Sequence, residues 1–134
     1  MIMSSIFSKL INGELPCYKV AESKDFFAFL DIHPNTLGHT LCVPKKVEDK
    51  IFDLSEIEYL NLMKFSRKVA LAIRKEVKCK RVGISVIGLE VPHVHVHLIP
   101  INKIEDMTFQ TKVNVDHKKM ILLAANIANS FSLL

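Results

Sequence analysis

The stretch VPHVHVHLIP, residues 91–100, places a histidine at every second position between apolar residues. This alternation has the period of a β-strand, in which successive side chains point to opposite faces of the sheet. We therefore predict a strand over residues 92–100, with three histidines on one face: His93, His95 and His97. The other face carries the residues expected in the core: Val94, Val96 and Leu98. Such a strand would pack with one face and do chemistry with the other.

Three interpretations of this row of imidazoles are compatible with the strand. Histidines at neighbouring strand positions can ligate zinc, with water in an open coordination position. A neutral imidazole can instead attack phosphorus while its neighbours donate hydrogen bonds to the phosphate oxygens. The third interpretation is a solvated strand face that carries histidines without a function. The strand by itself does not separate the metal site from the nucleophile.

Composition limits the classes of protein to which the chain can belong. Its 134 residues fit one domain, residues 1–134. Hydrophobic residues make up 49% of the chain, which is enough to form a core. The net charge of +4 is spread along the chain and does not form one basic block. We therefore expect no nucleic-acid partner, and a small anionic ligand suits this charge better.

The three cysteines, Cys17, Cys42 and Cys79, are far apart and form no CxxC pair. This spacing argues against a cysteine zinc site and against a disulfide framework. Reduced thiols are typical of a cytoplasmic protein. The first residues do not resemble a signal peptide, and the apolar tail over 120–134 is too short to span a bilayer. We therefore expect no membrane partner.

Hydrophobic periodicity and turn residues predict a helix, three strands, a long helix, two strands and a helix. The long helix is expected from Ser55 to Val77, because Ser55 and Glu58 fit a capping box. A tight connection around Gly88 is expected between the last two strands. Strands grouped on either side of a helix indicate an α+β fold, with a mainly antiparallel five-stranded sheet and flanking short helices. The long helix carries an apolar stripe: Leu62, Phe65, Val69 and Ile73. The other elements are expected over residues 4–12, 17–23, 25–31, 39–45, 81–88, 92–100 and 116–131.

Residues outside this strand favour a nucleotide over a metal ion. A metal site needs carboxylates or histidines close by to orient its ligands, and the nearest acid in the sequence is Glu90, before the strand. A nucleotide needs an apolar slot for its base, an acid for the ribose and donors for the phosphate. Asp31 is the candidate acid, although it could simply form a turn, and His39 joins the other histidines as a donor. The candidates for the slot are Ile6, Phe7, Leu10 and Phe29, which could equally be core.

The residues from His93 to Ile99 match in full the His-φ-His-φ-His-φ-φ signature of the histidine triad (HIT) nucleotide-binding superfamily, where φ is an apolar residue. Two further stretches resemble this family in order and spacing: IFSKLINGELP, residues 6–16, and FFAFLDIHPNTLGHTLCVPKK, residues 26–46. The resemblance covers at least residues 6–100. The chain looks most like the single-domain, Hint-like branch.

The resemblance implies a homodimer of α+β subunits whose five-stranded sheets join across the interface. Proteins of this family bind purine nucleotides such as AMP and GMP and cleave a bond at the α-phosphorus. His95 would be the nucleophile that forms a nucleotidyl-histidine intermediate, with His93, His97 and His39 around it. The implied nucleotide pocket is formed by Ile6, Phe7, Leu10, Phe29, Asp31 and Ile32, with Leu89 and Glu90 before the triad.

The resemblance also implies that catalysis needs no metal ion or other cofactor. Some bacterial relatives bind zinc through cysteines, and Ser5 and Ser8 stand in this region of the present chain. The expected activity is a phosphoramidase-like one, on purine nucleoside phosphoramidates or related adenylated compounds. A dinucleoside polyphosphate hydrolase of the Fhit type, or a nucleotide-binding protein with little turnover, are the alternatives.

The chain departs from the family pattern just before the triad. Relatives often carry a glutamine after the glycine at this place, whereas this chain reads Gly88-Leu89-Glu90-Val91-Pro92 after a short loop. Leucine cannot hydrogen-bond a phosphate oxygen or a leaving group. We therefore expect slow turnover with ordinary nucleotide affinity, unless Leu89 instead packs against a neighbouring strand or subunit.

Overall fold

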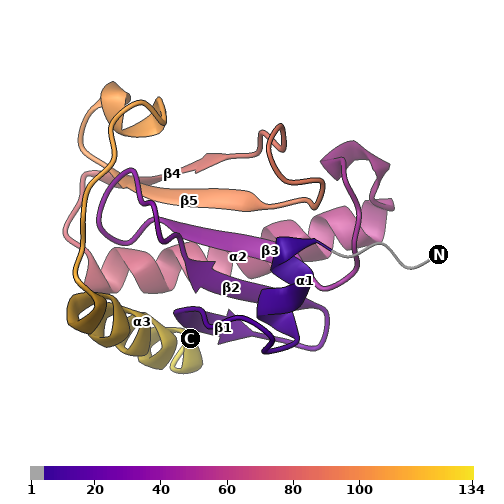
Figure 1. The fold of residues 1–134 in the computed structure, drawn as a ribbon, viewed down its shortest axis with the longest axis horizontal. Helices are drawn as coiled ribbons and strands as arrows, with labels where there is room; N and C mark the ends of the chain where they lie inside the picture. The colour runs from indigo at the N-terminus through magenta and orange to yellow at the C-terminus, as the bar shows by residue number, and fades with distance from the viewer. Residues whose placement is uncertain (1–4) are drawn as a thin grey trace.

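A five-stranded antiparallel sheet with the strand order β1-β2-β3-β5-β4 forms the centre of the computed structural model, which describes residues 5–134 (Figure 1). The α+β prediction is confirmed. The strands are β1 Lys19–Glu22, β2 Phe26–Leu30, β3 Thr40–Pro44, β4 Arg81–Ser85 and β5 Val96–Ile101. The helices are α1 Ile6–Ile11, α2 Glu56–Glu76 and α3 His117–Ser132, with 3₁₀ turns η1 Ile51–Asp53 and η2 Ile104–Met107 that were not predicted.

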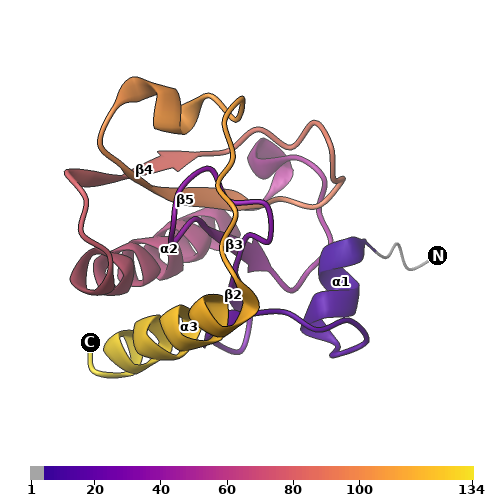
Figure 2. The same cartoon turned by 60° about the vertical axis from the view of Figure 1, so that its left-hand side comes forward.

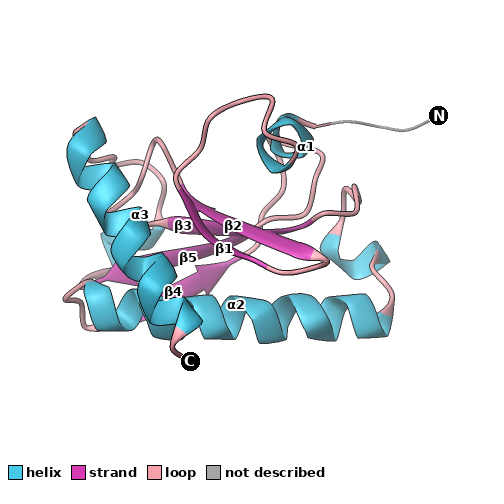
Figure 3. Ribbon diagram, turned by 90° about the horizontal axis from the view of Figure 1, so that it is seen from below, coloured by secondary structure: helices cyan, strands magenta, loops and turns pink. Residues whose placement is uncertain are grey.

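The two faces of the sheet have different covers. Helices α2 and α3 pack on one face, whereas α1 lies on the opposite side (Figures 2 and 3). Along β2 the side chains alternate: Ala28 and Leu30 join the core under α2, and Phe27 and Phe29 join a smaller apolar cluster with Phe7 of α1. The α2 face holds the main core. The α1 face leaves room for a site.

Helix α2 begins as predicted. The Ser55 hydroxyl accepts from the Glu58 N–H at 3.2 Å, and the Glu58 carboxylate accepts from the Ser55 N–H at 2.9 Å. All four residues of the predicted apolar stripe are buried. Helix α3 is capped by Asp116, whose carboxylate accepts from the Lys119 N–H, and it packs on α2 and β1. Helix α3 has 16 residues, so it is longer than the short flanking helix that the predicted architecture included. Within residues 5–134, no helix has both the length and the apolar composition to cross a membrane.

The histidine strand is shorter than predicted. Val94, Val96 and Leu98 are buried in the core under α2, as expected. However, β5 begins only at Val96, so His93 and His95 precede it and only His97 lies within it. The predicted tight connection around Gly88 is also wrong, because β4 ends at Ser85 and residues 86–95 form an irregular connection.

The physical reason is that the backbone before Val96 has other partners. Pro92 has no N–H to donate to a ladder. The N–H of His93 donates to the Val91 carbonyl at 2.8 Å, and the N–H of Val94 donates to the Glu48 carbonyl at 2.7 Å. The β3 ladder accordingly ends at the pair Cys42–Val96.

Candidate active site

Four histidines form a buried cluster on the α1 face of the sheet. His39 and His93 are 0% exposed, His95 is 7% exposed and His97 is 8% exposed. The ring centroids of His95 and His97 are 4.9 Å apart, and those of Phe7 and His95 are 5.0 Å apart, with the two rings at 71° to each other. The alternation therefore does bring the triad rings together. A solvated strand face is excluded, because these rings are covered.

The orientation of His95 is determined by its own backbone neighbour. Its Nδ1 lies 2.8 Å from the carbonyl oxygen of His93. A carbonyl oxygen only accepts hydrogen bonds, so Nδ1 carries the proton of the neutral ring. The Nε2 atom then holds a lone pair. A neutral imidazole in this tautomer is a nucleophile.

His93 is held at both ring nitrogens. Its Nε2–H donates to the carbonyl of Pro44 at 2.7 Å, which leaves Nδ1 to accept from the Ser5 hydroxyl at 2.6 Å. Burial lowers the pKa of His93 and favours this neutral form. The ring does not line the cavities described below, so His93 acts on the site by placing the carbonyl that orients His95. The sequence did not identify Ser5 as a contact of the triad.

His39 and His97 form a second chain of hydrogen bonds. The backbone N–H of Asn35 donates to His39 Nδ1 at 3.0 Å, so the proton of the neutral His39 ring is on Nε2. That Nε2–H donates to His97 Nδ1 at 2.9 Å. The proton of neutral His97 is then on Nε2, where it can be donated to a ligand.

Burial keeps this second pair neutral. Desolvation, followed by the neighbouring His97, lowers the pKa of His39 to about 3. Desolvation, followed by the neighbouring His95, lowers the pKa of His97 to about 4. Both rings are therefore uncharged near neutral pH in the absence of an anion.

One group of side chains in the described part of the chain has the spacing of metal ligands. Ligand atoms of Asp31, His39 and His97 all lie within 4.8 Å of one another, and His39 Nε2 is 3.6 Å from an Asp31 oxygen. A metal ion would need the Nε2 lone pair of His39. The Asn35 N–H instead leaves the proton on this atom, so the hydrogen-bond pattern disfavours ligation. Catalysis without a metal ion stays a prediction.

A cavity of about 480 Å³ between α1 and β2, which we call the α1 cavity, opens onto His95 and His97. It gathers all six residues of the implied nucleotide pocket: Ile6, Phe7, Leu10, Phe29, Asp31 and Ile32. Phe7 and Phe29 are buried in its wall, whereas Ile6 and Ile32 are exposed at its rim. Asp31 also forms the expected turn, because its carboxylate accepts from the His33 N–H at 2.8 Å. Burial raises the pKa of Asp31.

A second cavity of about 470 Å³, the 108–112 cavity, continues from the first past the two histidines. The two cavities share Asp31, His33, Glu90, His95 and His97. The second one adds residues that sequence reasoning missed: Thr108, Phe109 and Lys112. They lie in an irregular segment after η2, where no local pattern marks them. Glu90 thus lies in the implied pocket, and Leu89 lies only beside it, in the second cavity.

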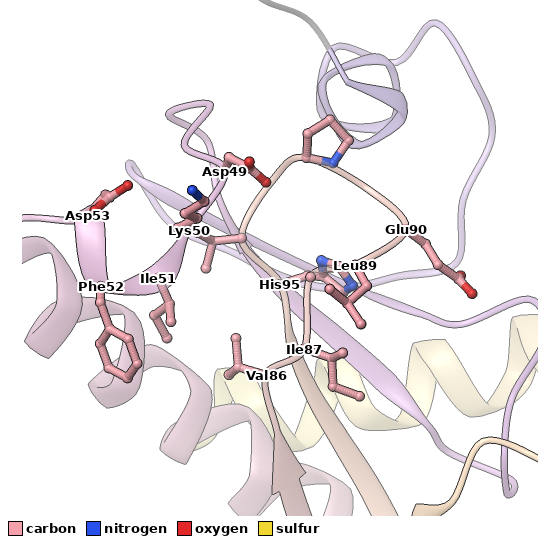
Figure 4. Close-up of a pocket in the computed structure, with 13 residues that line it drawn as sticks. Asp49, Lys50, Ile51, Phe52, Asp53, Val86, Ile87, Leu89, Glu90 and His95 are labelled. Atoms are coloured by element: carbon pink, nitrogen blue, oxygen red, sulfur yellow. The ribbon is translucent and has the colours of Figure 1, made fainter.

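A third and larger cavity of about 600 Å³, the η1 cavity, lies between η1 and residues 86–92 and also reaches His95 (Figure 4). Leu89 lines both this cavity and the 108–112 cavity, and it is 89% exposed. Within the subunit, Leu89 therefore does not pack against a neighbouring strand. His39, in contrast, lines none of the three cavities and contacts the site only through His97.

A family model for the HIT domain matches residues 12–104. The chain belongs to the HIT family. An uncharacterised HIT-like protein of Borreliella burgdorferi is 34% identical over 132 residues, which is 92% of this chain and 95% of the relative. An adenosine 5'-monophosphoramidase of Schizosaccharomyces pombe is 37% identical over 99 residues, which is 73% of this chain and 74% of the relative.

Solved structures agree with the HIT fold. A hypothetical histidine triad nucleotide-binding protein of Sulfolobus tokodaii superimposes with a TM-score of 0.82 at 31% identity, covering 96% of this chain and 93% of that protein. The resemblance on which the sequence analysis relied is thus confirmed for family and fold.

The neutral histidines predict a pH dependence of stability. The folded-state pKa values of His39, His93 and His97 lie below the ordinary value of 6.5. As the pH falls below 6.5, the unfolded chain binds protons at these positions before the folded chain does. The free energy of unfolding should therefore fall between pH 6.5 and pH 5, with a slope that approaches about 1.4 kcal/mol per pH unit for each of His39 and His97, whose folded-state pKa values are about 3 and about 4. His93 contributes in the same direction.

Urea unfolding at several pH values measures this slope. His39→Gln removes one of the titrating rings and should flatten it, while carboxylates titrate mainly below this window. A free energy of unfolding that stayed constant from pH 6.5 to pH 5 would contradict the neutral state of the cluster.

Proposed function

We propose that the chain is a nucleotide hydrolase or transferase that cleaves purine nucleoside phosphoramidates, or related adenylated compounds, at the α-phosphorus. The observation that carries this proposal is the His95 ring, which has a lone pair on Nε2 and lines the α1 cavity and the 108–112 cavity alike. A substrate that spans both cavities would bring its phosphorus to this ring. The similarity to an adenosine 5'-monophosphoramidase supports the same substrate class.

The α1 cavity suits the nucleoside. Its apolar wall, with Phe7 and Phe29, is suited to a flat purine base, and Ile6 and Ile32 lie at its rim. The Asp31 carboxylate accepts a single bond from the His33 N–H, and its remaining lone pairs can accept from ribose hydroxyls. The phosphate would then reach the two histidines that both cavities share.

The reaction would proceed in two displacements. His95 Nε2 attacks the α-phosphorus, a phosphorus–nitrogen bond to the enzyme forms, and the leaving group departs with the electron pair of the broken bond. Water then cleaves the nucleotidyl-histidine and restores the free imidazole. The His97 Nε2–H donates to a phosphoryl oxygen or to the leaving group, where negative charge develops. Because the lone pair of the neutral tautomer is on Nε2, the attack needs no separate base.

Two alternatives share this geometry. A dinucleoside polyphosphate hydrolase would use the same nucleophile but release a nucleotide instead of an amine. A nucleotide-binding protein with little turnover would bind AMP tightly and release no product. Product analysis with adenosine phosphoramidate and diadenosine triphosphate separates these possibilities.

The three free cysteines are consistent with the proposed cytoplasmic location.

The homodimer is also a proposal. Strand β4 is at the edge of the sheet and offers unpaired backbone groups to a second copy. Exposed apolar side chains lie on β4 and on α2, namely Ile84, Ile57 and Leu60. A two-fold contact between like surfaces would bury them. Light scattering at micromolar concentration should give twice the subunit mass of 15.2 kDa, and a monomer mass would overturn the proposal.

His95→Ala should abolish turnover of adenosine 5'-phosphoramidate while AMP still binds. The variant removes the attacking nitrogen, whereas the apolar wall and Asp31 remain. Steady-state kinetics and AMP titration calorimetry measure the two effects. The matched control is His117→Ala, which should keep full activity. His117 is an exposed histidine at the start of α3 that hydrogen-bonds Tyr18. A nucleotidyl adduct trapped on any other residue would refute the assignment of His95.

Leu89→Gln should raise the rate on phosphoramidates. An amide at this exposed position beside His95 could donate to developing charge, and one such donor is worth on the order of a hundredfold in kcat. AMP affinity and melting temperature should change little, because Leu89 makes no contribution to the buried core. Leu122→Gln, an equally polar change at an exposed leucine of α3, is the control. A lower melting temperature without a gain in rate would show that Leu89 has a packing role instead.

A further inference from the structure

Lys112 lines the 108–112 cavity and has no acidic partner. Its ammonium donates to the side-chain oxygen of Asn35 at 2.7 Å, and it lies 5.0 Å from the centre of the Phe109 ring. Among residues 5–134, no carboxylate oxygen lies within the 4.0 Å of Lys112 Nζ that would make an ion pair. The positive charge is therefore held in place by a neutral amide and an aromatic ring. Two of its three N–H groups are free to bind a ligand.

The segment that carries Lys112 is anchored at both ends on the connection between β2 and β3. Asn35 donates from its side-chain amide to the Asp106 carbonyl at 3.0 Å, and the Val113 N–H donates to the Pro34 carbonyl at 3.0 Å. Figures 1 and 2 show this segment, between η2 and α3, running beside residues 31–39. Lys112 is an exposed residue, but the segment that carries it is fixed by these two contacts and its ammonium by the bond to Asn35.

The backbone conformation of Phe109 is a second indication that this segment contributes to the site. Its φ of 62° is in the left-handed region, which is unfavourable for a residue with a Cβ atom. In this conformation its ring lies edge-on against His97, with the centroids 4.8 Å apart. The strained backbone therefore brings an aromatic wall against the histidine and places Lys112 beyond it.

Charge distinguishes the two cavities that could take the group leaving from the phosphorus. Beyond the residues shared with the α1 cavity, the only charged residue that lines the 108–112 cavity is Lys112. The η1 cavity instead adds two acids, Asp49 and Asp53, and one base, Lys50. The 108–112 cavity also contains Asp31 and Glu90, which it shares with the α1 cavity. An anionic leaving group therefore meets a cation among the residues that the 108–112 cavity adds, and mostly acids among those that the η1 cavity adds.

We propose that Lys112 binds an anionic leaving group, so that the site favours nucleotides whose α-phosphate carries a second phosphate or another acidic substituent. This inference rests on the proposed function, because it assumes that the nucleoside occupies the α1 cavity and the α-phosphorus lies at His95. A phosphate chain would continue from His97 along Phe109 to the ammonium. A charge-assisted contact of this kind should contribute on the order of tenfold to a hundredfold in affinity.

Binding of AMP and ADP tests the proposal without depending on turnover. Both nucleotides are titrated calorimetrically into His95→Ala protein, with and without Lys112→Met. With Lys112 present, ADP should bind at least tenfold more tightly than AMP. Lys112→Met should remove this preference, and Lys112→Arg should keep most of it. Lys24→Met, in the turn between β1 and β2, is the control and should leave the ratio unchanged.

The outcomes separate the two proposals. A preference for ADP that survives Lys112→Met, or no preference at all, overturns the role of Lys112. Equal weakening of AMP and ADP assigns the lysine to the α-phosphate and likewise overturns the inference. If wild-type protein turns over neither phosphoramidate nor ADP while the Lys112-dependent preference is present, the proposed function fails and the anion site stands. If neither nucleotide binds, both proposals are wrong.

Discussion

The hydrogen bond between the His95 ring and the His93 carbonyl depends on the backbone leaving the sheet at Val96. Strand β5 lies between β3 and β4, so a carbonyl within it is normally an acceptor in a ladder. Had the strand extended to residue 92, the His93 carbonyl would have been committed to a neighbouring strand. The chain instead leaves the ladder, and that carbonyl is available to a side chain two residues later. The nucleophile is thus oriented at the point where the regular sheet ends.

Backbone groups also determine where every proton of the cluster lies. The carbonyls of Pro44 and His93 can only accept, and the N–H of Asn35 can only donate. These three groups assign the tautomers of His93, His95 and His39, and the bond from His39 then assigns His97. The arrangement leaves a lone pair at His95 and a donor at His97, which are the two functions that a displacement at phosphorus needs. The same assignment removes the lone pair that a metal ion would need at His39.

Much of this fold could be predicted because its local signals agree with its packing. The capping box at Ser55 and the apolar stripe of α2 are local patterns, and both appear in the structure. The alternation of residues 94–98 correctly identified the core face. The same alternation overestimated the length of the strand, because side-chain periodicity continues beyond the last ladder pair. Only Pro92 hinted at that end.

The parts of the site that could not be predicted are contacts between distant residues. Ser5 and His93 are separated by 88 positions, and Asn35 and Lys112 by 77. No local periodicity reports such pairs, and the segment from η2 to α3 has no regular pattern. Five of the six predicted pocket residues in the α1 cavity were candidates from the sequence before the family resemblance was considered, and the resemblance added Ile32 and joined them into one pocket. Taken singly, each of them was equally compatible with core or turn.

The lysine and the histidines are coupled through charge as well as through Asn35. After desolvation and one neighbouring imidazole, the Lys112 charge also lowers the pKa of His39 and of His97. Lys112 therefore helps to keep these two rings neutral. Protonation of His97 would place a second proton on Nδ1, the atom that already accepts the hydrogen bond from His39 Nε2–H. The hydrogen-bond network therefore keeps His97 neutral, with its Nε2–H as the donor to a bound phosphoryl group. Lys112 then supplies the positive charge that an anionic ligand needs and that the neutral imidazoles do not provide.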